Sequence, residues 1–344
     1  MSRGFPYKVL PSGWFQVAWS DELQHGQVLP LHYFGEHMVC YRTESGEVHV
    51  LDAVCAHQGA HLGYGGKVEG DCVRCPMHGW AWAADGSNID IPDSSRDRVK
   101  ARLRTWHVCE RNEQIYVWHD ADQRPPTWDL PEFEYFADRS YRRSATLGRK
   151  IWREAKMAPQ MLIENTVDVA HIRWVHGGVS PAVQEDATVR DHLFQSVINQ
   201  SFPTATGGEF IGRTVVDNFG VGITCSDMSP TPSIRVINIE NATPISPEVI
   251  DLRCTILVKL NNASDDELDE ADTRRLHRAF HSYVTSTDDD MPIWEHMDYR
   301  VKALLTPEEM KTMRVLRNWA RQFYPDAGKV DSLIPAGDTA SISP

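Results

Sequence analysis

The segment CAHQGAHLGYGGKVEGDCVRCPMHGW at residues 55–80 constrains the fold and chemistry of this chain more than any other. It holds three cysteines and three histidines, in a chain with only 7 Cys and 15 His. Cys55 and His57 form a C-x-H pair, and seventeen residues later Cys75 and His78 form a C-x-x-H pair. Each half offers one thiolate and one imidazole. The many glycines between and beside them allow the tight turns of two facing loops.

This spacing predicts a [2Fe–2S] cluster of the Rieske type. Ordinary clusters of this kind are held by four cysteines, whereas two neutral histidines on one iron raise the reduction potential. A zinc site is the alternative, because Cys72-x-x-Cys75 with His57 or His78 could make a Cys₂His₂ shell. Under the Rieske interpretation, Cys72 and His61 bind no metal. The four predicted cluster ligands are Cys55, His57, Cys75 and His78.

Length and charge limit the class of protein. A chain of 344 residues suits two domains, and its 35 basic against 48 acidic residues give a net charge of −13. That charge repels nucleic acid and anionic membrane surfaces. The sequence has no secretion signal and no apolar window of about 18 residues, so we expect no membrane span. Its scattered cysteines therefore predict reduced thiols or metal ligands in the cytoplasm.

The patterning predicts an α+β fold with two domains. Residues from about 10 to 119 alternate as strands do, whereas DADQRPPTWDLPEF is Pro-rich and acidic and predicts a linker. We place the domains at residues 1–125 and 126–344. In the second domain, residues 150–176 predict a helix and residues 190–260 predict antiparallel strands. A long helix with an acidic start and a final amphipathic helix follow.

A second group of metal-ligand residues lies in the predicted helix, in ENTVDVAHIRWVH. On a helix, Asp168 and His171 share a face, and Glu164 lies one turn earlier. Acids and a histidine among apolar residues are costly to bury unless something binds them. His176 is about 140° round a regular helix from His171, so both reach one metal only if the helix ends there. The Gly-Gly pair at residues 177–178 supplies that ending.

Two histidines and one carboxylate on one side of an iron leave the other side open to O₂, as in non-haem Fe(II) oxygenases. The expected carboxylate is Asp290 in TDDDMPIW, because it shares a helical face with Tyr283 and Trp294. Asp288 and Asp289 should then face water. The predicted iron ligands are His171, His176 and Asp290. The following residues are candidates for the pocket lining, although a plain core position is the commoner role for each: Phe210, Phe219, Ile223 and Ile237.

With these motifs in this order, the chain resembles the α subunits of Rieske non-haem iron oxygenases. In detail it looks like the oxygenase component of 3-ketosteroid 9α-hydroxylase. The supporting stretches are IYVWHDADQRPPTW at 115–128, MLIEN at 161–165, TVDVAHIRWVH at 166–176, DMPIWEH at 290–296 and LRNWARQFYPD at 316–326. The resemblance implies an N-terminal all-β Rieske domain. It also implies a C-terminal catalytic domain of the START-like, helix-grip type, with an antiparallel sheet flanked by helices.

The resemblance also implies a head-to-tail homotrimer, in which the cluster of one subunit lies near the iron of the next. His78 would hydrogen-bond across that interface to Asp168, and Asp168 would hold the iron ligand His171. Asp168 is therefore the expected bridge for electron transfer.

From these residues we hypothesise a monooxygenase that takes O₂ and electrons and hydroxylates a small apolar substrate, such as a 3-ketosteroid or similar polycyclic compound. The chain has no G-x-G-x-x-G loop after a strand, so NAD(P)H electrons would arrive through a ferredoxin or a flavin/iron–sulfur reductase. Other Rieske reactions remain open: N- or O-demethylation, ring dihydroxylation or sterol desaturation. From other classes, an electron carrier with a binding domain and a zinc-binding interaction module also remain.

Overall fold

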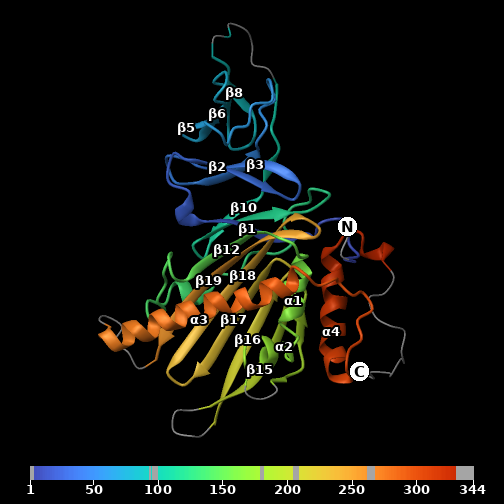
Figure 1. Ribbon diagram of the computed structural model, residues 1–344. Helices are drawn as coiled ribbons and strands as arrows, with labels where there is room; N and C mark the ends of the chain where they lie inside the picture. Colours follow the sequence, from blue (N-terminus) through green and yellow to red (C-terminus); the bar gives the residue numbers. More distant parts are fainter. Residues whose placement is uncertain are drawn as a thin grey trace.

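Antiparallel sheets from the two halves of the chain meet in the middle of the molecule, between a narrow N-terminal part and a broad C-terminal sheet (Figure 1). The computed structural model describes residues 4–92, 94, 100–178, 182–203, 209–261 and 268–330. The architecture is α+β and mostly β, as the sequence predicts. No helix in these ranges is both long and apolar enough to cross a membrane.

The N-terminal half forms three small sheets. The first has the order β1-β11-β10, the second β2-β3-β4-β9 and the third β5-β6-β7-β8. In the third sheet each strand pairs with the next one along the chain, and the strands are only two or three residues long. The strands are β1 Gly13–Trp19, β2 Val28–Tyr33, β3 Glu36–Arg42, β4 Val48–Asp52, β5 Lys67–Glu69, β6 Cys72–Arg74, β7 Ala81–Trp82, β8 Asn88–Asp90, β9 Thr105–Trp106, β10 Val108–Arg111 and β11 Gln114–His119. Short 3₁₀ helices at Ser20–Glu22 and Glu134–Phe136 follow β1 and β11.

The C-terminal half forms one eight-stranded sheet in the order β12-β19-β18-β17-β16-β15-β13, with β14 paired to β15. Side chains alternate between its two faces. Ile237 and Ile239 pack toward the N-terminal half with Trp14 and Tyr116. The opposite face is covered by helices. The strands are β12 Arg149–Ala155, β13 Val183–Gln184, β14 Thr188–Arg190, β15 Leu193–Pro203, β16 Glu209–Phe219, β17 Ile223–Thr231, β18 Ile234–Ser246 and β19 Val249–Leu260.

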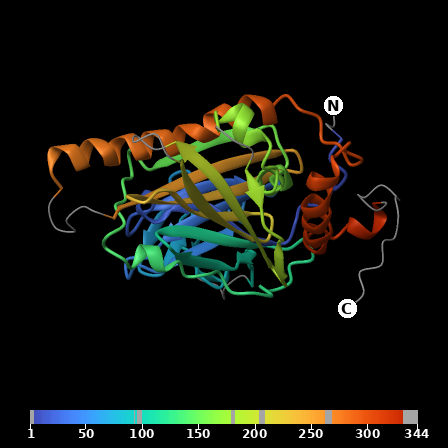
Figure 2. The same ribbon diagram turned by 90° about the horizontal axis from the view of Figure 1, so that it is seen from below.

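A long helix, α3 (Glu270–Trp294), lies across the helix-covered face of this sheet (Figures 1 and 2). Its N-cap residue Asp269 accepts a hydrogen bond from the backbone of Asp272 at 2.7 Å. Phe280 and Val284 pack against Val236 and other residues of β18 and β19. This is the predicted helix-grip arrangement. The remaining helices are α1 Pro159–Asn165, α2 His171–Val175 and α4 Pro307–Ala320, followed by 3₁₀ turns at Arg321–Phe323 and Ala327–Lys329.

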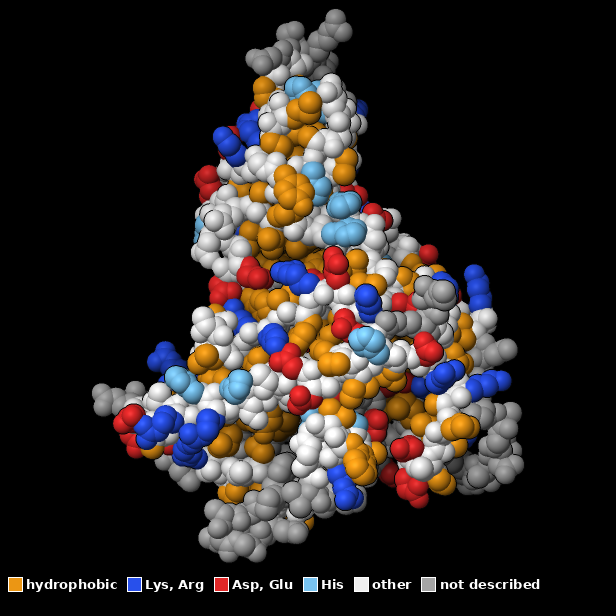
Figure 3. All heavy atoms as spheres, viewed as in Figure 1, with side chains coloured by type: hydrophobic (Ala, Val, Ile, Leu, Met, Phe, Trp, Pro, Cys, Tyr) orange, Lys and Arg blue, Asp and Glu red, His pale blue; other side chains and the backbone are white. Residues whose placement is uncertain are grey.

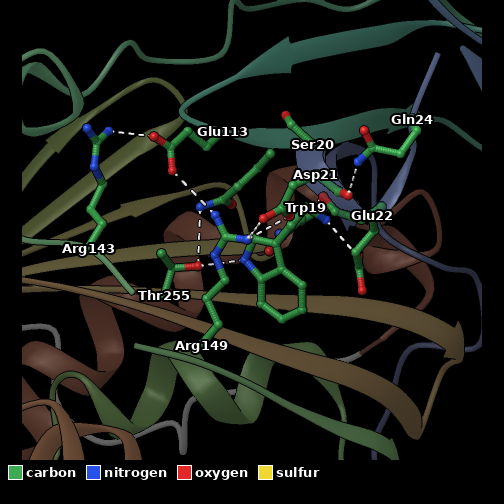
Figure 4. A network of polar contacts seen from close by, with 12 residues as sticks. Trp19, Ser20, Asp21, Glu22, Gln24, Glu113, Arg143, Arg149 and Thr255 are labelled. Carbon is green, nitrogen blue, oxygen red and sulfur yellow. Dashed lines mark hydrogen bonds and ion pairs between the residues drawn. The ribbon is translucent and has the colours of Figure 1, made fainter. Parts of the chain in front are cut away.

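Charged contacts tie the N-terminal sheets to the C-terminal sheet (Figure 4). Arg149 of β12 donates to both carboxylate oxygens of Asp21, at 2.7 and 2.8 Å, and to Glu113 at 3.3 Å. Arg143 also donates to Glu113, and Trp19 Nε1 donates to Thr255 Oγ1 at 2.9 Å. These contacts, which join residues between 30 and 236 positions apart, connect the two halves of the chain.

The helix expected over residues 150–176 is not continuous. Residues 149–155 form the edge strand β12, which pairs with β19 from Arg149↔Thr255 to Ala155↔Ile250. Helix α1 then ends where Thr166 Oγ1 donates to the carbonyl of Ile163 at 2.7 Å. Strand pairing with a distant segment therefore overrides the local helical pattern at 150–155.

Glu164 does not lie in the predicted metal site. Its carboxylate accepts two hydrogen bonds from Arg317 of α4, at 2.9 and 2.7 Å, and one from Tyr299. Both charged side chains are almost buried, with 7% and 12% of their surface exposed. This ion pair fastens α1, the helix that precedes the metal ligands, to α4.

Replacing Arg317 by methionine should destabilise the fold by about 3–5 kcal/mol, because it leaves the buried Glu164 charge without its partner. Urea denaturation followed by circular dichroism measures this loss. Arg274→Met is the matched control, since Arg274 forms an exposed pair with Glu270 one helical turn away, and we expect it to cost less than about 1 kcal/mol. Equal losses in the two variants would contradict the assignment.

Candidate metal centres

The two Cys/His loops have the same backbone structure. In the first, Cys55 N–H donates to Ala60 O at 2.9 Å and Gly59 N–H donates to Cys55 O at 2.9 Å. In the second, Cys75 N–H donates to Trp80 O at 2.9 Å and Gly79 N–H to Cys75 O at 3.0 Å. Gly59 and Gly79 both have positive φ, 82° and 71°, which favours glycine. The repeated turn gives each loop the same orientation of its cysteine and histidine.

The four predicted cluster ligands lie together at the ends of these loops. Cys55 and Cys75 are buried, with 1% and 4% exposed. The rings of His57 and His78 are exposed and 4.7 Å apart, edge to face. Cys72 lies instead in the β5–β6 hairpin, where its thiol donates to Glu69 O at 3.1 Å. The loop geometry therefore fits two inner thiolates and two outer imidazoles and gives no support to a zinc shell containing Cys72.

Trp82 provides a further test of fit for an iron–sulfur cluster. Its indole N–H is completely buried and has no hydrogen-bond partner in the described structure. Burial raises the pKa of the Cys55 thiol, and the nearby Trp82 indole opposes this rise by favouring the thiolate. A buried donor without a partner is costly, and the sulfur atoms of a bound cluster would supply the missing acceptor. The donor set therefore suits a thiolate-bound cluster.

Replacing Trp82 by phenylalanine should lower the midpoint potential of the cluster, because hydrogen bonds to the sulfurs stabilise the reduced state. A hydrogen bond of about 1 kcal/mol corresponds to roughly 40 mV for one electron. A potentiometric titration followed by EPR measures the shift. Trp106→Phe is the control, since Trp106 Nε1 donates to Asp52 at 2.9 Å and not to a cysteine. An unchanged potential in the Trp82 variant would rule out this hydrogen bond.

The second centre combines three side chains from α2 and α3. Ligand atoms of His171, His176 and Asp290 all lie within 4.8 Å of one another. His176 Nε2 is 3.3 Å from Asp290 Oδ2, and Asp290 is 7% exposed. Gly177 has φ of 69°, and both His176 N–H and Gly178 N–H donate to Ile172 O, so α2 ends between the two histidines' positions. This ending brings His176 back toward His171.

The surroundings of His171 set its tautomer. Its Nδ1–H donates to the backbone carbonyl of Asp168, which leaves Nε2 as the lone-pair nitrogen for a metal. The Asn165 side-chain amide lies 3.3 Å from that Nε2. The Asp168 carboxylate does not contact the ring; its Oδ1 accepts from Ala170 N–H at 3.2 Å. Two imidazole nitrogens and one carboxylate fit the ligand set of an Fe(II) site with open positions.

Iron binding at this centre should weaken as pH falls. In the metal-free protein, the hydrogen bond to Asp290 raises the pKa of His176 above 6.5, against the effect of burial. The charged pair therefore stabilises the metal-free fold below pH 6.5, and this contribution is lost as pH rises through the raised pKa. Iron must displace that proton, so we expect the affinity for iron to fall about tenfold for each pH unit below the raised pKa of His176. Iron content after dialysis at several pH values tests this, with cluster absorbance as the control.

Other predicted residues lie away from the centre. Asp289 is exposed, as predicted, whereas Asp288 is half-buried, because it binds Lys150 and accepts from Trp152 Nε1 at 2.9 Å. Three of the candidate lining residues, Phe219, Ile223 and Ile237, are wrong, because they pack on the opposite face of the sheet against the N-terminal half. Successive side chains of a strand point to opposite faces of the sheet, so moving by one residue along the strand changes the face. Phe210 lies nine residues before Phe219 on the same strand, so its side chain is on the helix-covered face of the sheet.

Sequence reasoning missed Glu240, which lies on β18 beside this centre. Burial and the charge of Asp290 together raise the pKa of the Glu240 carboxyl to about 7. The signal was present in VINIEN, where the polar residues Asn238 and Glu240 share one face of the strand and Ile237 and Ile239 share the other.

Comparison with known proteins finds a family match for each half of the chain. Residues 13–107 match the Rieske [2Fe-2S] domain, and residues 117–324 match the 3-Ketosteroid 9alpha-hydroxylase C-terminal domain. A probable 3-ketosteroid-9-alpha-monooxygenase oxygenase component of Rhodococcus rhodochrous is 27% identical over 94% of this chain and 82% of its own length. Cholesterol 7-desaturase of Caenorhabditis elegans is 32% identical over 54% of this chain, and the match spans only 43% of that relative.

The fold is also found in solved structures. Dicamba monooxygenase bound to dicamba superposes with a TM-score of 0.72 at 17% identity, covering 92% of this chain and 98% of that one. The two family matches cover both the cluster loops and the helices that carry the two histidines and Asp290. The chain belongs to the Rieske non-haem iron oxygenases, in the branch that shares its catalytic domain with 3-ketosteroid 9α-hydroxylases.

Proposed function

We propose that this chain is the terminal oxygenase of a monooxygenase system and that it hydroxylates an apolar polycyclic compound, with 3-ketosteroids as the first candidates. The observation that carries the proposal is the group of His171, His176 and Asp290, whose ligand atoms lie within 4.8 Å. Bound there, iron supplies the activation of O₂. The reaction balances with two electrons and two protons: one oxygen atom enters a C–H bond and the other leaves as water.

The chain's own residues orient the ligands and exclude water. Asp168 O fixes His171, the end of α2 aims His176, and α3 holds Asp290 against the sheet. In this proposal the substrate lies between helix α3 and the sheet, where apolar side chains would keep the reacting carbon away from water. The metal performs the oxidation and the protein positions the substrate.

Electrons would come from NAD(P)H through a separate ferredoxin or flavin/iron–sulfur reductase and would enter the cluster one at a time. A cytoplasmic location is part of the proposal, since all seven cysteines are unpaired, as expected in a reducing compartment.

A head-to-tail homotrimer is proposed as the working form. The cluster loops lie at the narrow end of the molecule, whereas α1 and α2 lie in the lower half, with other strands between them (Figure 1). Hydrophobic and histidine side chains gather on the surface of the narrow end (Figure 3). Tyr64 and Met77 are 70% and 58% exposed there, and Trp174 beside the iron ligands is 81% exposed. Contact between these surfaces in neighbouring subunits would cover both.

Mixed trimers test the arrangement. We would co-express His78→Ala, which spoils the cluster, with Asp290→Ala, which spoils the iron site. Transfer between subunits predicts that the mixture regains activity that neither variant has alone, because one subunit's cluster serves the next subunit's iron. A mixture that is trimeric by light scattering but no more active than either variant alone would contradict transfer between subunits.

The substrate is tested with a surrogate reductase. O₂ uptake and product formation are followed together, first with 3-ketosteroids, then with sterols, small aromatics and N-methyl compounds. Coupled turnover of a ketosteroid supports the proposal. Turnover only of small aromatics or N-methyl compounds would refute the polycyclic assignment. Sterol desaturation is the second candidate, favoured by the 32% identity to the cholesterol 7-desaturase. It would introduce a double bond and leave no oxygen atom from O₂ in the product.

A further inference from the structure

The two predicted histidine ligands of the cluster, His57 and His78, have exposed rings that no hydrogen bond holds within the described residues. The ring of His171 at the iron centre is different, because its Nδ1–H donates to the backbone carbonyl of Asp168. Such a hydrogen bond is the usual way in which a protein orients the ring of a metal-binding histidine. Another kind of contact therefore orients the histidines of the cluster loops.

The indole of Trp80 lies flat against the ring of His57. The two ring centroids are 4.5 Å apart and the ring planes differ by only 6°. Trp80 is half-buried and packs against the hydrophobic core beneath the loops, so it is a firmer support than a fully exposed side chain. A metal on an imidazole nitrogen lies in the plane of the ring. The stacked indole therefore covers a face of His57 without competing for its coordinating nitrogen.

This support is given to one histidine only. The two Cys/His loops have the same backbone hydrogen bonds, so Ala60 in the first loop is equivalent to Trp80 in the second. The methyl group of Ala60 cannot cover His78 as the indole covers His57. The one ring contact of His78 in the described part of the chain is edge to face with His57, at 4.7 Å. The two histidines are therefore held differently.

The second loop is also anchored more firmly than the first. Arg74 Nη1 donates to Gly79 O and to Asp90 Oδ2, both at 2.8 Å. A Cβ atom added to Gly79 would lie 3.0 Å from the Pro92 ring, whereas one added to Gly59 would meet no described atom within 4 Å. The anchored second loop can therefore support the exposed ring of the first loop.

From these contacts we infer that Trp80 is a positioning residue for the cluster, and that its indole holds the His57 imidazole in one orientation while His78 has no such support. The inference takes both histidines as cluster ligands, which is itself a prediction. A stacked aromatic pair favours the stacked orientation by about 2–10-fold. Without the indole, the His57 ring would turn, and its bond to iron would vary from molecule to molecule.

The experiment compares Trp80→Leu, which removes the stacked ring, with Trp80→Phe, which keeps one. Pulsed EPR of the reduced protein measures the nitrogen hyperfine coupling of each histidine ligand, and a chelator added to the oxidised protein bleaches the cluster. In Trp80→Leu, we expect the coupling of one histidine to broaden and that of the other to stay unchanged. Bleaching should become about 2–10-fold faster. Trp80→Phe should resemble the wild type in both measurements.

His32→Leu is the matched control. His32 stacks on His37 in an exposed pair of the same half of the chain, with ring centroids 4.5 Å apart and planes 18° apart. Neither residue is a predicted ligand, so this variant should keep the wild-type couplings and bleaching rate. Thermal unfolding followed by circular dichroism detects any general loss of packing. Trp80→Met replaces the leucine variant if that protein holds no cluster.

Each outcome separates the inference from the ligand assignment. Wild-type couplings and bleaching in the leucine or methionine variant would overturn the inference and leave the ligands unchanged. Equal broadening of both couplings, or a phenylalanine variant as disturbed as the leucine variant, would make Trp80 a packing residue only. Loss of the cluster from both non-aromatic variants, but not from Trp80→Phe, would support the inference. A wild-type cluster without coupling to two histidine nitrogens would overturn the ligand assignment and the inference together.

Discussion

Replacing Asp290 by alanine should remove the mononuclear iron while the cluster remains, and product formation should fall by more than about 100-fold. Loss of a residue that only supports a metal ligand already costs 10–100-fold in affinity or activity. Asp290 contributes the single carboxylate, and its Oδ2 lies 3.3 Å from His176 Nε2. Removing it leaves two neutral imidazoles, which hold Fe(II) weakly. Iron analysis and turnover with excess reductase measure the two effects.

Asp289→Ala is the control for this experiment. Asp289 is the neighbouring residue on α3 but is exposed, so its removal changes the charge of the helix without touching the centre. We expect full iron content and near wild-type turnover. An Asp290→Ala protein that still holds one mononuclear iron and consumes O₂ with substrate would show that another residue supplies the carboxylate.

Replacing Asp168 by asparagine should leave both metal centres in place and reduce product formation by about 100-fold or more. The substitution keeps the backbone carbonyl that accepts from His171 Nδ1–H, so the iron ligand stays in position. The carboxylate uses Oδ1 for Ala170 N–H, and Oδ2 has no partner in the described part of the chain. That oxygen is the one available to His78 of a neighbouring subunit. Its loss should interrupt the proposed path between the centres.

Single-turnover kinetics separate this effect from a loss of iron. The cluster is reduced chemically and mixed with O₂ and substrate, and its reoxidation is followed by absorbance. In Asp168→Asn the cluster should stay reduced long after the wild-type cluster has reoxidised, with iron content unchanged. Wild-type reoxidation and product yield would remove Asp168 from the electron path, and loss of iron would assign it a structural role only.

Motifs within one loop or one helix end could be predicted from the sequence. The spacing of Cys55, His57, Cys75 and His78 describes two loops whose hydrogen bonds are local, so no distant contact was needed to predict them. The same is true of the break after His176, which depends on Gly177 with φ of 69°.

Features that depend on strand pairing could not be predicted in the same way. Residues 150–155 have a helical pattern but become β12, because β19, about 100 residues later, offers a pairing edge. Glu164 has the right spacing for the metal face but binds Arg317, 153 residues away. Glu240 meets Thr287 only because β18 lies under α3. Phe219, Ile223 and Ile237 face the N-terminal half because the pairing register of their strands puts these side chains on that face of the sheet.

Nitric oxide binding to the anaerobically reduced protein tests the central claim most directly, because NO occupies an open coordination position on Fe(II) and makes it visible by EPR. The account predicts two signals per chain: that of a reduced Rieske cluster, and an S = 3/2 ferrous–nitrosyl signal that is lost in Asp290→Ala. A protein that shows the cluster signal with full iron loading but no nitrosyl signal would have no open iron site, and oxygen chemistry at His171, His176 and Asp290 would be contradicted.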